Sequence, residues 1–163
     1  MTTGVRAPAH GRRWLDGDAR ALLAERLEEA VRRARQRGAD GAVLAAVTVP
    51  APGVDPVALV AASRRPGEAW FALEQPDRDG TAVAALGCVR ALEASGPDRF
   101  AAVAGAWRRL VADALADPPD GPAGAGLVAV GGFAFAPAGG AVPAWAGFAP
   151  ASLGLALRAI ECL

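Results

Sequence analysis

No residue between positions 121 and 157 carries a charge, and a stretch this long without charge limits the structures that the chain can adopt. A stretch this apolar could cross a membrane as a helix, which needs about 20 consecutive residues. Four prolines divide it into pieces too short for such a helix. They are Pro122, Pro137, Pro143 and Pro150. We therefore expect the stretch to be buried against protein, with no membrane span.

The position of this stretch raises the question of what covers it. Only a few residues follow position 157 in a chain of 163 residues, and large apolar surfaces of soluble proteins are normally covered. We expect the natural cover to lie in sequence that this chain does not contain, which would leave the chain poorly soluble. Self-association through residues 121–157 is the other way to bury the surface.

The composition indicates a folded domain or part of a larger one. Hydrophobic residues make up 53% and charged residues 21%, which excludes the composition of a disordered chain. Lys plus Arg and Asp plus Glu both total 17, so no excess charge attracts the chain to nucleic acid. Residues 1–15 lack the apolar run of a secretory signal, and we expect them to form a disordered tail.

Three helices are predicted from capping residues that precede apolar positions at helical spacing. The first begins at Asp16 or Asp18 and ends near Gly38, and the second covers residues 57–62 after Asp55 and Pro56. The third begins at Pro97 and Asp98, and we expect Pro118 and Pro119 to end it. Its expected apolar face consists of Phe100, Val103, Ala104, Trp107, Leu110, Val111 and Leu115.

Four strands are predicted from apolar runs between turn residues. They cover residues 42–49, 68–74, 81–92 and 127–135, and the second and third form a hairpin around Asp79 and Gly80. Gly131 and Gly132 indicate a bulge or a close backbone approach in the last strand. The chain lacks the glycine-rich turn of a dinucleotide-binding unit. We therefore predict an α+β fold with a mainly antiparallel sheet flanked by helices.

Missing residue types exclude several kinds of chemistry. The chain has no Lys, so no Schiff base and no phosphate-binding P-loop Lys can form. The single His, His10, lies in the expected tail, and Ser63, Ser95 and Ser152 therefore have no structured base for a hydrolase triad. Two cysteines in unrelated contexts, Cys88 and Cys162, support neither a disulfide framework nor a zinc site, and they fit a reducing cytoplasm.

The remaining polar clusters are interpreted as structural. Glu28 and Glu29 fall on a polar helix face, Asp77 and Asp79 in a turn, and the arginines of residues 32–37 at a solvated helix end. Cys88 is expected to be a small buried side chain. Trp70, Trp107 and Trp145 are expected to anchor the packing. The residues alone assign no catalytic, cofactor-binding or metal-binding position.

The order of motifs resembles the amino-terminal part of isochorismate synthases, within the chorismate-utilising family that includes anthranilate synthase component I and salicylate synthase. The most specific motif is GGFAF at residues 131–135, followed after a short loop by Trp145 and Phe148. The other matching segments are VDPVALVAAS at 54–63, EAWFALEQPDRDG at 68–80, ALGCVRALEASGPDRFAAVAGAW at 85–107 and GLVAVGGFAFAP at 126–137.

This resemblance implies the first part of the chorismate-utilising enzyme fold over residues 16–153. It implies a parent enzyme that converts chorismate to isochorismate with magnesium, for menaquinone or siderophore synthesis. The family's general-base Lys and magnesium-binding Glu residues match no position here, so we expect no activity and no bound magnesium in this chain alone. Residues 154–163 depart from the pattern and are expected to be a divergent end, truncated or frame-shifted.

Two other interpretations remain open. The parent could be a different chorismate enzyme, of the salicylate or anthranilate synthase type. The chain could also be a non-catalytic module that pairs with another subunit through its uncharged surface, or the product of a broken gene.

Overall fold

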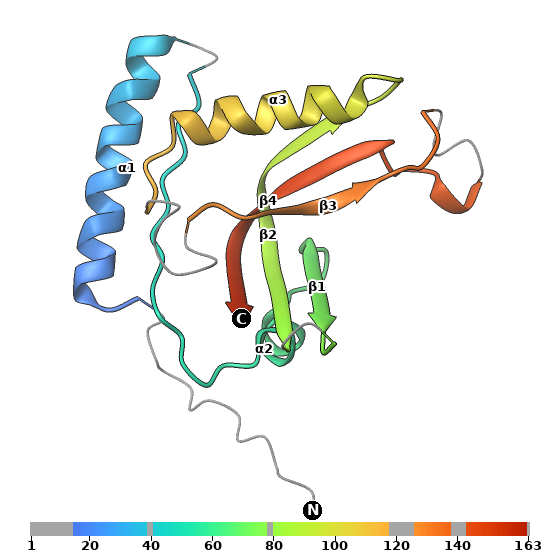
Figure 1. Cartoon of the computed structure of the whole chain (residues 1–163). Coiled ribbons are helices and arrows are strands. Elements are labelled where there is room, and N and C mark those ends of the chain that lie inside the picture. Colours follow the sequence, from blue (N-terminus) through green and yellow to red (C-terminus); the bar gives the residue numbers. More distant parts are fainter. Residues whose placement is uncertain (1–14, 39–40, 78–79, 118–125, 138–142, 163) are drawn as a thin grey trace, which may run out of the picture.

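The computed structural model describes residues 15–38, 41–77, 80–117, 126–137 and 143–162. Its centre is a four-stranded antiparallel sheet with the strand order β1-β2-β4-β3 (Figure 1). The strands are β1 (Trp70–Gln75), β2 (Thr81–Ala94), β3 (Ala129–Phe133) and β4 (Ala151–Cys162). The helices are α1 (Gly17–Arg37), α2 (Pro56–Ser63) and α3 (Arg99–Ala112), with a 3-10 turn at Pro143–Trp145. The predicted α+β class is confirmed.

The first two helices begin where their capping residues predict. The Asp16 carboxylate accepts a hydrogen bond from the Ala19 N–H at 2.8 Å, and the Asp55 carboxylate accepts one from the Ala58 N–H at 2.9 Å. Each bond satisfies a backbone donor that the helix itself leaves free. Pro56 occupies the first position of α2, where its missing N–H costs nothing.

The third helix ends earlier than predicted. It stops at Ala112, because the chain beyond it pairs with another segment: the Leu115 N–H donates to the Leu44 carbonyl at 2.8 Å. Pro118 and Pro119 lie outside the described residues. On its apolar face Val103 is 1% exposed, whereas Phe100 and Val111 lie at the margin and are 49% and 40% exposed.

The predicted strand over residues 42–49 is wrong. This segment makes one isolated parallel bridge, between Ala45 and Leu115, and joins no sheet. The Ala46 N–H donates to the Leu115 carbonyl at 2.9 Å. The apolar run is therefore extended backbone, and its partner is the segment after α3, a pairing that no local pattern reveals.

The β1–β2 hairpin is confirmed, and β2 then continues into the centre of the sheet. The register between β2 and β4 shifts between Cys88 and Arg90, so β2 carries one extra residue there. Such a bulge reverses which alternate side chains face a given side of the sheet. Leu86 and Leu92 both have even numbers, yet Leu86 packs with α2 and Leu92 packs with α3.

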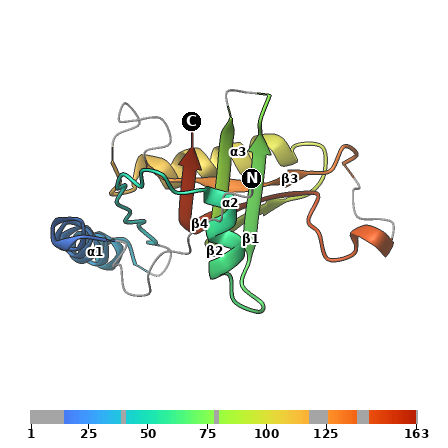
Figure 2. The same cartoon turned by 90° about the horizontal axis from the view of Figure 1, so that it is seen from below.

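The bulge thus divides the core into two clusters. One contains Leu92 and Val103 together with Ala151 and Leu155 of β4, and the other contains Val60, Ala84 and Leu86. Figure 2 shows α2 in front of the β1–β2 hairpin and α3 behind the sheet. The two helices therefore cover opposite faces.

Only part of the uncharged stretch is buried. Ala151 and Leu155 are 0% and 2% exposed, but Phe135, Trp145 and Phe148 remain largely exposed. Within the described part of the chain, no helix combines the length and apolar character that a membrane crossing requires.

The predicted close approach at Gly131 is confirmed. A Cβ atom at this position would lie 2.0 Å from the Ser152 carbonyl oxygen of β4, whereas a Cβ at Gly132 would meet nothing within 4 Å. Only Gly131 is therefore required by the contact between the two strands.

Candidate functional site

No metal-binding group is formed by the residues that the structure describes: none of their His, Cys, Asp and Glu side chains gather in threes around a common point. His10 and Asp79 lie outside these residues, as does the expected tail up to residue 14. The side chain of Cys162 is also outside the description. Ser63 ends α2, and Ser152 lies in β4, where its hydroxyl is 3.4 Å from the Glu93 carboxylate.

The arginines at the end of α1 lie at a solvated surface, as the sequence predicts, and three of them, Arg32, Arg33 and Arg37, form ion pairs. Arg32 and Arg33 donate to the Glu29 carboxylate at 2.7 and 2.6 Å, and these hydrogen bonds, first that of Arg33, lower the Glu29 pKa. Arg37 reaches the Asp113 carboxylate at 2.9 Å and lowers the Asp113 pKa. Exposed pairs of this kind add little stability, and the charges of Arg32, Arg33 and Arg37 are each met by a carboxylate.

Two expectations about burial are wrong. Cys88 is exposed, because it lies at the register shift of β2, where the alternation of buried and exposed positions changes. Trp70 and Trp145 are 54% and 59% exposed. Trp107 packs against the core cluster of α3, and it is the only one of these three tryptophans that acts as an anchor.

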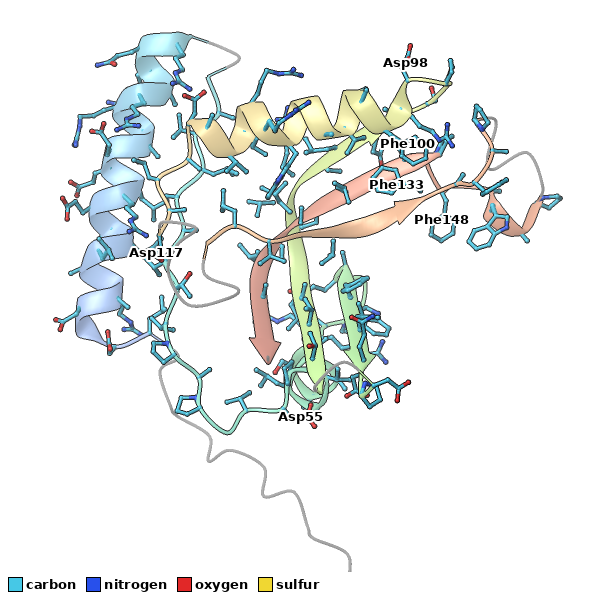
Figure 3. The ribbon with its side chains drawn as sticks, in the orientation of Figure 1. Asp55, Asp98, Phe100, Asp117, Phe133 and Phe148 are labelled. Atoms are coloured by element: carbon cyan, nitrogen blue, oxygen red, sulfur yellow. The ribbon has the colours of Figure 1, made fainter. Side chains whose placement is uncertain are left out.

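Apart from Trp70, the large exposed aromatic side chains belong to the start of α3, to the end of β3 and to the segment that leads into β4. We call Phe100, Phe133, Phe135, Trp145 and Phe148 the aromatic surface; each is at least 44% exposed. Phe100 and Phe133 contact each other with ring centroids 5.1 Å apart, and Trp145 and Phe148 meet edge to face at 5.8 Å. Figure 3 shows Phe100 and Phe133 together between α3 and β3.

A buried arginine that no sequence pattern predicts joins this surface to the sheet. Arg99 is 2% exposed, and its guanidinium donates to the carbonyls of Gly96, Ala134 and Phe135 at 3.2, 2.8 and 3.0 Å. Its charge lies 4.2 Å from the centre of the Phe100 ring, a favourable cation–π arrangement. An Arg in the first turn of a helix normally points to solvent, so no sequence signal marks it.

A shallow pocket lies between α2 and β1. It is lined by residues 64–68 and Trp70, and the Arg64 guanidinium lies 5.1 Å from the centre of the Trp70 ring. The Arg65 N–H donates to the Glu68 carboxylate at 3.1 Å. Both arginines are exposed, so this hollow places positive charge beside the Glu68 carboxylate at an open surface, and none of its lining residues is a Ser, Cys or His.

A second polar network fastens α1 to the rest of the fold. Arg26 donates to the Asp117 carboxylate at 2.8 Å and also to the Ala46 carbonyl. The Thr48 N–H binds the same carboxylate at 2.5 Å. The two charged side chains are 17% and 23% exposed. The hydrogen bond from Arg26 outweighs burial and lowers the pKa of Asp117.

Replacing Asp117 with Ala is expected to lower the free energy of unfolding by about 1 to 3 kcal/mol at pH 7, because a half-buried Arg26 loses its charged partner. Since the folded-state pKa of Asp117 is lowered, its stabilisation is complete above its unfolded value of about 3.9 and is lost as the pH falls through the folded-state pKa. Urea unfolding monitored by circular dichroism at pH 7 and at low pH measures both effects.

Asp113→Ala is the matched control, because Asp113 forms the exposed pair with Arg37. Its loss is expected to cost far less than the loss of Asp117, because exposed ion pairs add little stability. Equal losses in the two variants, or an Asp117→Ala effect that does not shrink at low pH, would show that this network does not fasten α1.

Comparison with known proteins gives one family match. Residues 27–161 match the model of the family described as chorismate binding enzyme. No curated protein and no solved structure shows a significant match. The matched range includes α2, α3, the whole sheet up to residue 161 and the aromatic surface. It extends past residue 153, which is where the resemblance in the sequence motifs ends.

Proposed function

This chain belongs to the family of chorismate-binding enzymes, and from this membership we propose that it is the amino-terminal part of an isochorismate synthase. Such an enzyme moves the ring hydroxyl of chorismate by adding water at one carbon while the original hydroxyl leaves another. The observation that carries the proposal is the order of the motifs within the matched range: VDPVALVAAS, then GGFAF, then the pair of Trp145 and Phe148.

The proposal places the chemistry outside these residues. The family's general base is a Lys, and this sequence has none. The parent enzyme requires magnesium, but the described residues form no carboxylate group that fits it. We therefore propose no catalytic or metal-binding role for the described residues.

The aromatic surface supports the proposal that the catalytic residues lie in another part of the enzyme. Large exposed aromatic side chains such as Phe135 and Phe148 are normally covered by protein. A catalytic half packed on the aromatic surface would bury them, and the motif that resembles the family, GGFAF followed by Trp145, lies in the same place. We also propose that the enzyme is cytoplasmic, because its fold requires no disulfide.

The test begins with the DNA that follows the codon for Leu163, read in all three frames. The longest encoded protein is then purified and incubated with chorismate and magnesium, and the products are separated by liquid chromatography. We expect isochorismate, with no release of pyruvate. The 163-residue chain, assayed in parallel, is expected to turn over no chorismate above the rate without protein.

The alternatives give different outcomes. Pyruvate together with salicylate or anthranilate would replace isochorismate synthase with another enzyme of the family. Turnover of chorismate by the 163-residue chain would contradict the proposal that the catalytic residues lie outside it. The aromatic surface also fits a non-catalytic module, which would be favoured if the downstream DNA encodes no related segment in any frame.

A further inference from the structure

β3 lies at the edge of the sheet, with β4 on one side and no strand on the other among the described residues. Two hydrogen bonds fix the direction of its backbone groups. The Ala156 N–H donates to the Val128 carbonyl at 3.1 Å, and the Ala134 N–H donates to the Pro150 carbonyl at 2.8 Å. Hydrogen bonding alternates along an antiparallel strand. The even-numbered residues of β3 therefore bond to β4, and the odd-numbered ones present their N–H and C=O groups to the outer edge.

These outward-facing residues are Ala129, Gly131 and Phe133. Gly131 and Phe133 are exposed, and Ala129 is half-buried. A strand edge with open backbone groups is a template for another strand. The half-burial of Ala129 comes from its side chain, which packs against the core cluster beneath α3. Among the described residues no strand pairs with this edge, so the backbone groups of Ala129, Gly131 and Phe133 are available for pairing.

Soluble proteins usually guard such edges with charged side chains, and the two edges of this sheet differ in that respect. β1, at the opposite edge, carries Glu74 and is followed by Asp77. β3 has no charged residue, and none occurs anywhere between positions 121 and 157. Nothing in the sequence around β3 repels a second uncharged strand.

We propose that two copies of this chain pair through β3, antiparallel about a twofold axis at Gly131. Gly131 then lies opposite Gly131 of the second copy, and Ala129 lies opposite Phe133. This is the register in which outward-facing groups of one copy meet outward-facing groups of the other. It joins two four-stranded sheets into one continuous sheet, independently of the reaction proposed above.

The side chains in this register are self-complementary, as a twofold interface requires. Each large residue faces a small one: Phe133 faces Ala129, and Val130 faces Gly132. No two bulky side chains oppose each other, and no like charges meet across the axis. This complementarity within a single five-residue strand points to a second copy of the chain as the partner.

Sedimentation velocity over a range of protein concentrations tests the pairing. We expect a monomer–dimer equilibrium in the wild-type chain. Gly132→Lys should weaken association at least about tenfold, because it places two positive charges close to the axis. A Cβ at position 132 meets no atom within 4 Å, so the substitution should leave the fold intact, which circular dichroism checks. Gly132→Thr, neutral and strand-favouring, is the matched control and should still dimerise.

Amide hydrogen exchange, measured by NMR, tests the register. The N–H groups of Val130 and Gly132 should be protected at every concentration, since they bond to β4. Those of Ala129, Gly131 and Phe133 should gain protection only as the dimer forms. This alternation would not arise from aggregation through the aromatic surface.

Three results would overturn the proposal. The first is a chain that stays monomeric at all concentrations. The second is a dimer that Gly132→Lys does not weaken, which would place the interface elsewhere. The third is protection of the outward-facing amides in the monomer, which would mean that another segment of the same chain covers the edge.

Discussion

Gly131→Val should separate β3 from β4 and lower the free energy of unfolding by at least about 3 kcal/mol, the upper range for overpacking in a tightly packed site. The reason is geometric: a Cβ at position 131 would lie 2.0 Å from the Ser152 carbonyl oxygen and 3.0 Å from the Leu153 Cα. Both atoms belong to the backbone of the neighbouring strand, so no side-chain rotation relieves the overlap.

Gly132→Val is the matched control for this substitution. It introduces the same side chain one residue along the strand, where a Cβ meets nothing within 4 Å, and Val favours strands. We expect its stability to lie within about 1 kcal/mol of the wild type. Urea unfolding followed by tryptophan fluorescence compares the two, and equal losses would show that the close approach at Gly131 is not needed.

Gly131→Val in a complete parent enzyme distinguishes a role of Gly131 in packing from a role in ligand binding. If Gly131 serves packing, the enzyme fails to fold. A folded enzyme with weakened affinity for chorismate would instead mean that the glycine backbone approaches the ligand.

Leu155→Ala should lower the free energy of unfolding by about 2 to 5 kcal/mol. Leu155 is 2% exposed and lies in β4, which pairs with both β2 and β3. It packs in one cluster with Leu92, Val103 and Ala151. Truncating it removes apolar burial and leaves a cavity beneath α3, a position where surrounding strands cannot readily move together.

Leu157→Ala provides the comparison, because it is the same change two residues further along β4. Leu157 is 58% exposed, so its loss should cost less than about 1 kcal/mol. Chemical unfolding of both variants under identical conditions gives the difference. Similar losses would mean that the cluster around Leu155 is not the main core.

The helices were predictable from sequence because their signals are local. Asp16 and Asp55 each cap the helix that they precede, and a capping residue acts within one turn. The β1–β2 hairpin was predictable for the same reason. The end of α3 was not, since the bond between Leu115 and Leu44 depends on a segment far away in the sequence.

Burial along β2 could not be read from alternation alone. An inserted residue at the bulge changes the face of every residue after it. The nearest sequence signal is Gly87, whose φ is +70°; a glycine in a strand suggests a bulge but does not say which residue is the extra one. The exposure of Cys88 follows from this. The residues of the candidate site were also only partly predictable. The absence of Lys is visible in the sequence, but the burial of Arg99 depends on carbonyl groups of Ala134 and Phe135, which lie far away in the sequence.

The place of β4 in the sheet bears on how the chain folds as it is synthesised. β4 follows both β2 and β3 in sequence, yet it lies between them in the sheet. While the ribosome is still translating residues 151–162, α2 and the β1–β2 hairpin can already form, because their contacts are local. Until β4 is available, both edges of β3 are unpaired, and the sequence on either side of β3 carries no charge. Folding of this sheet is therefore expected to finish only after β4 emerges, and the nascent chain is most exposed to aggregation in that interval.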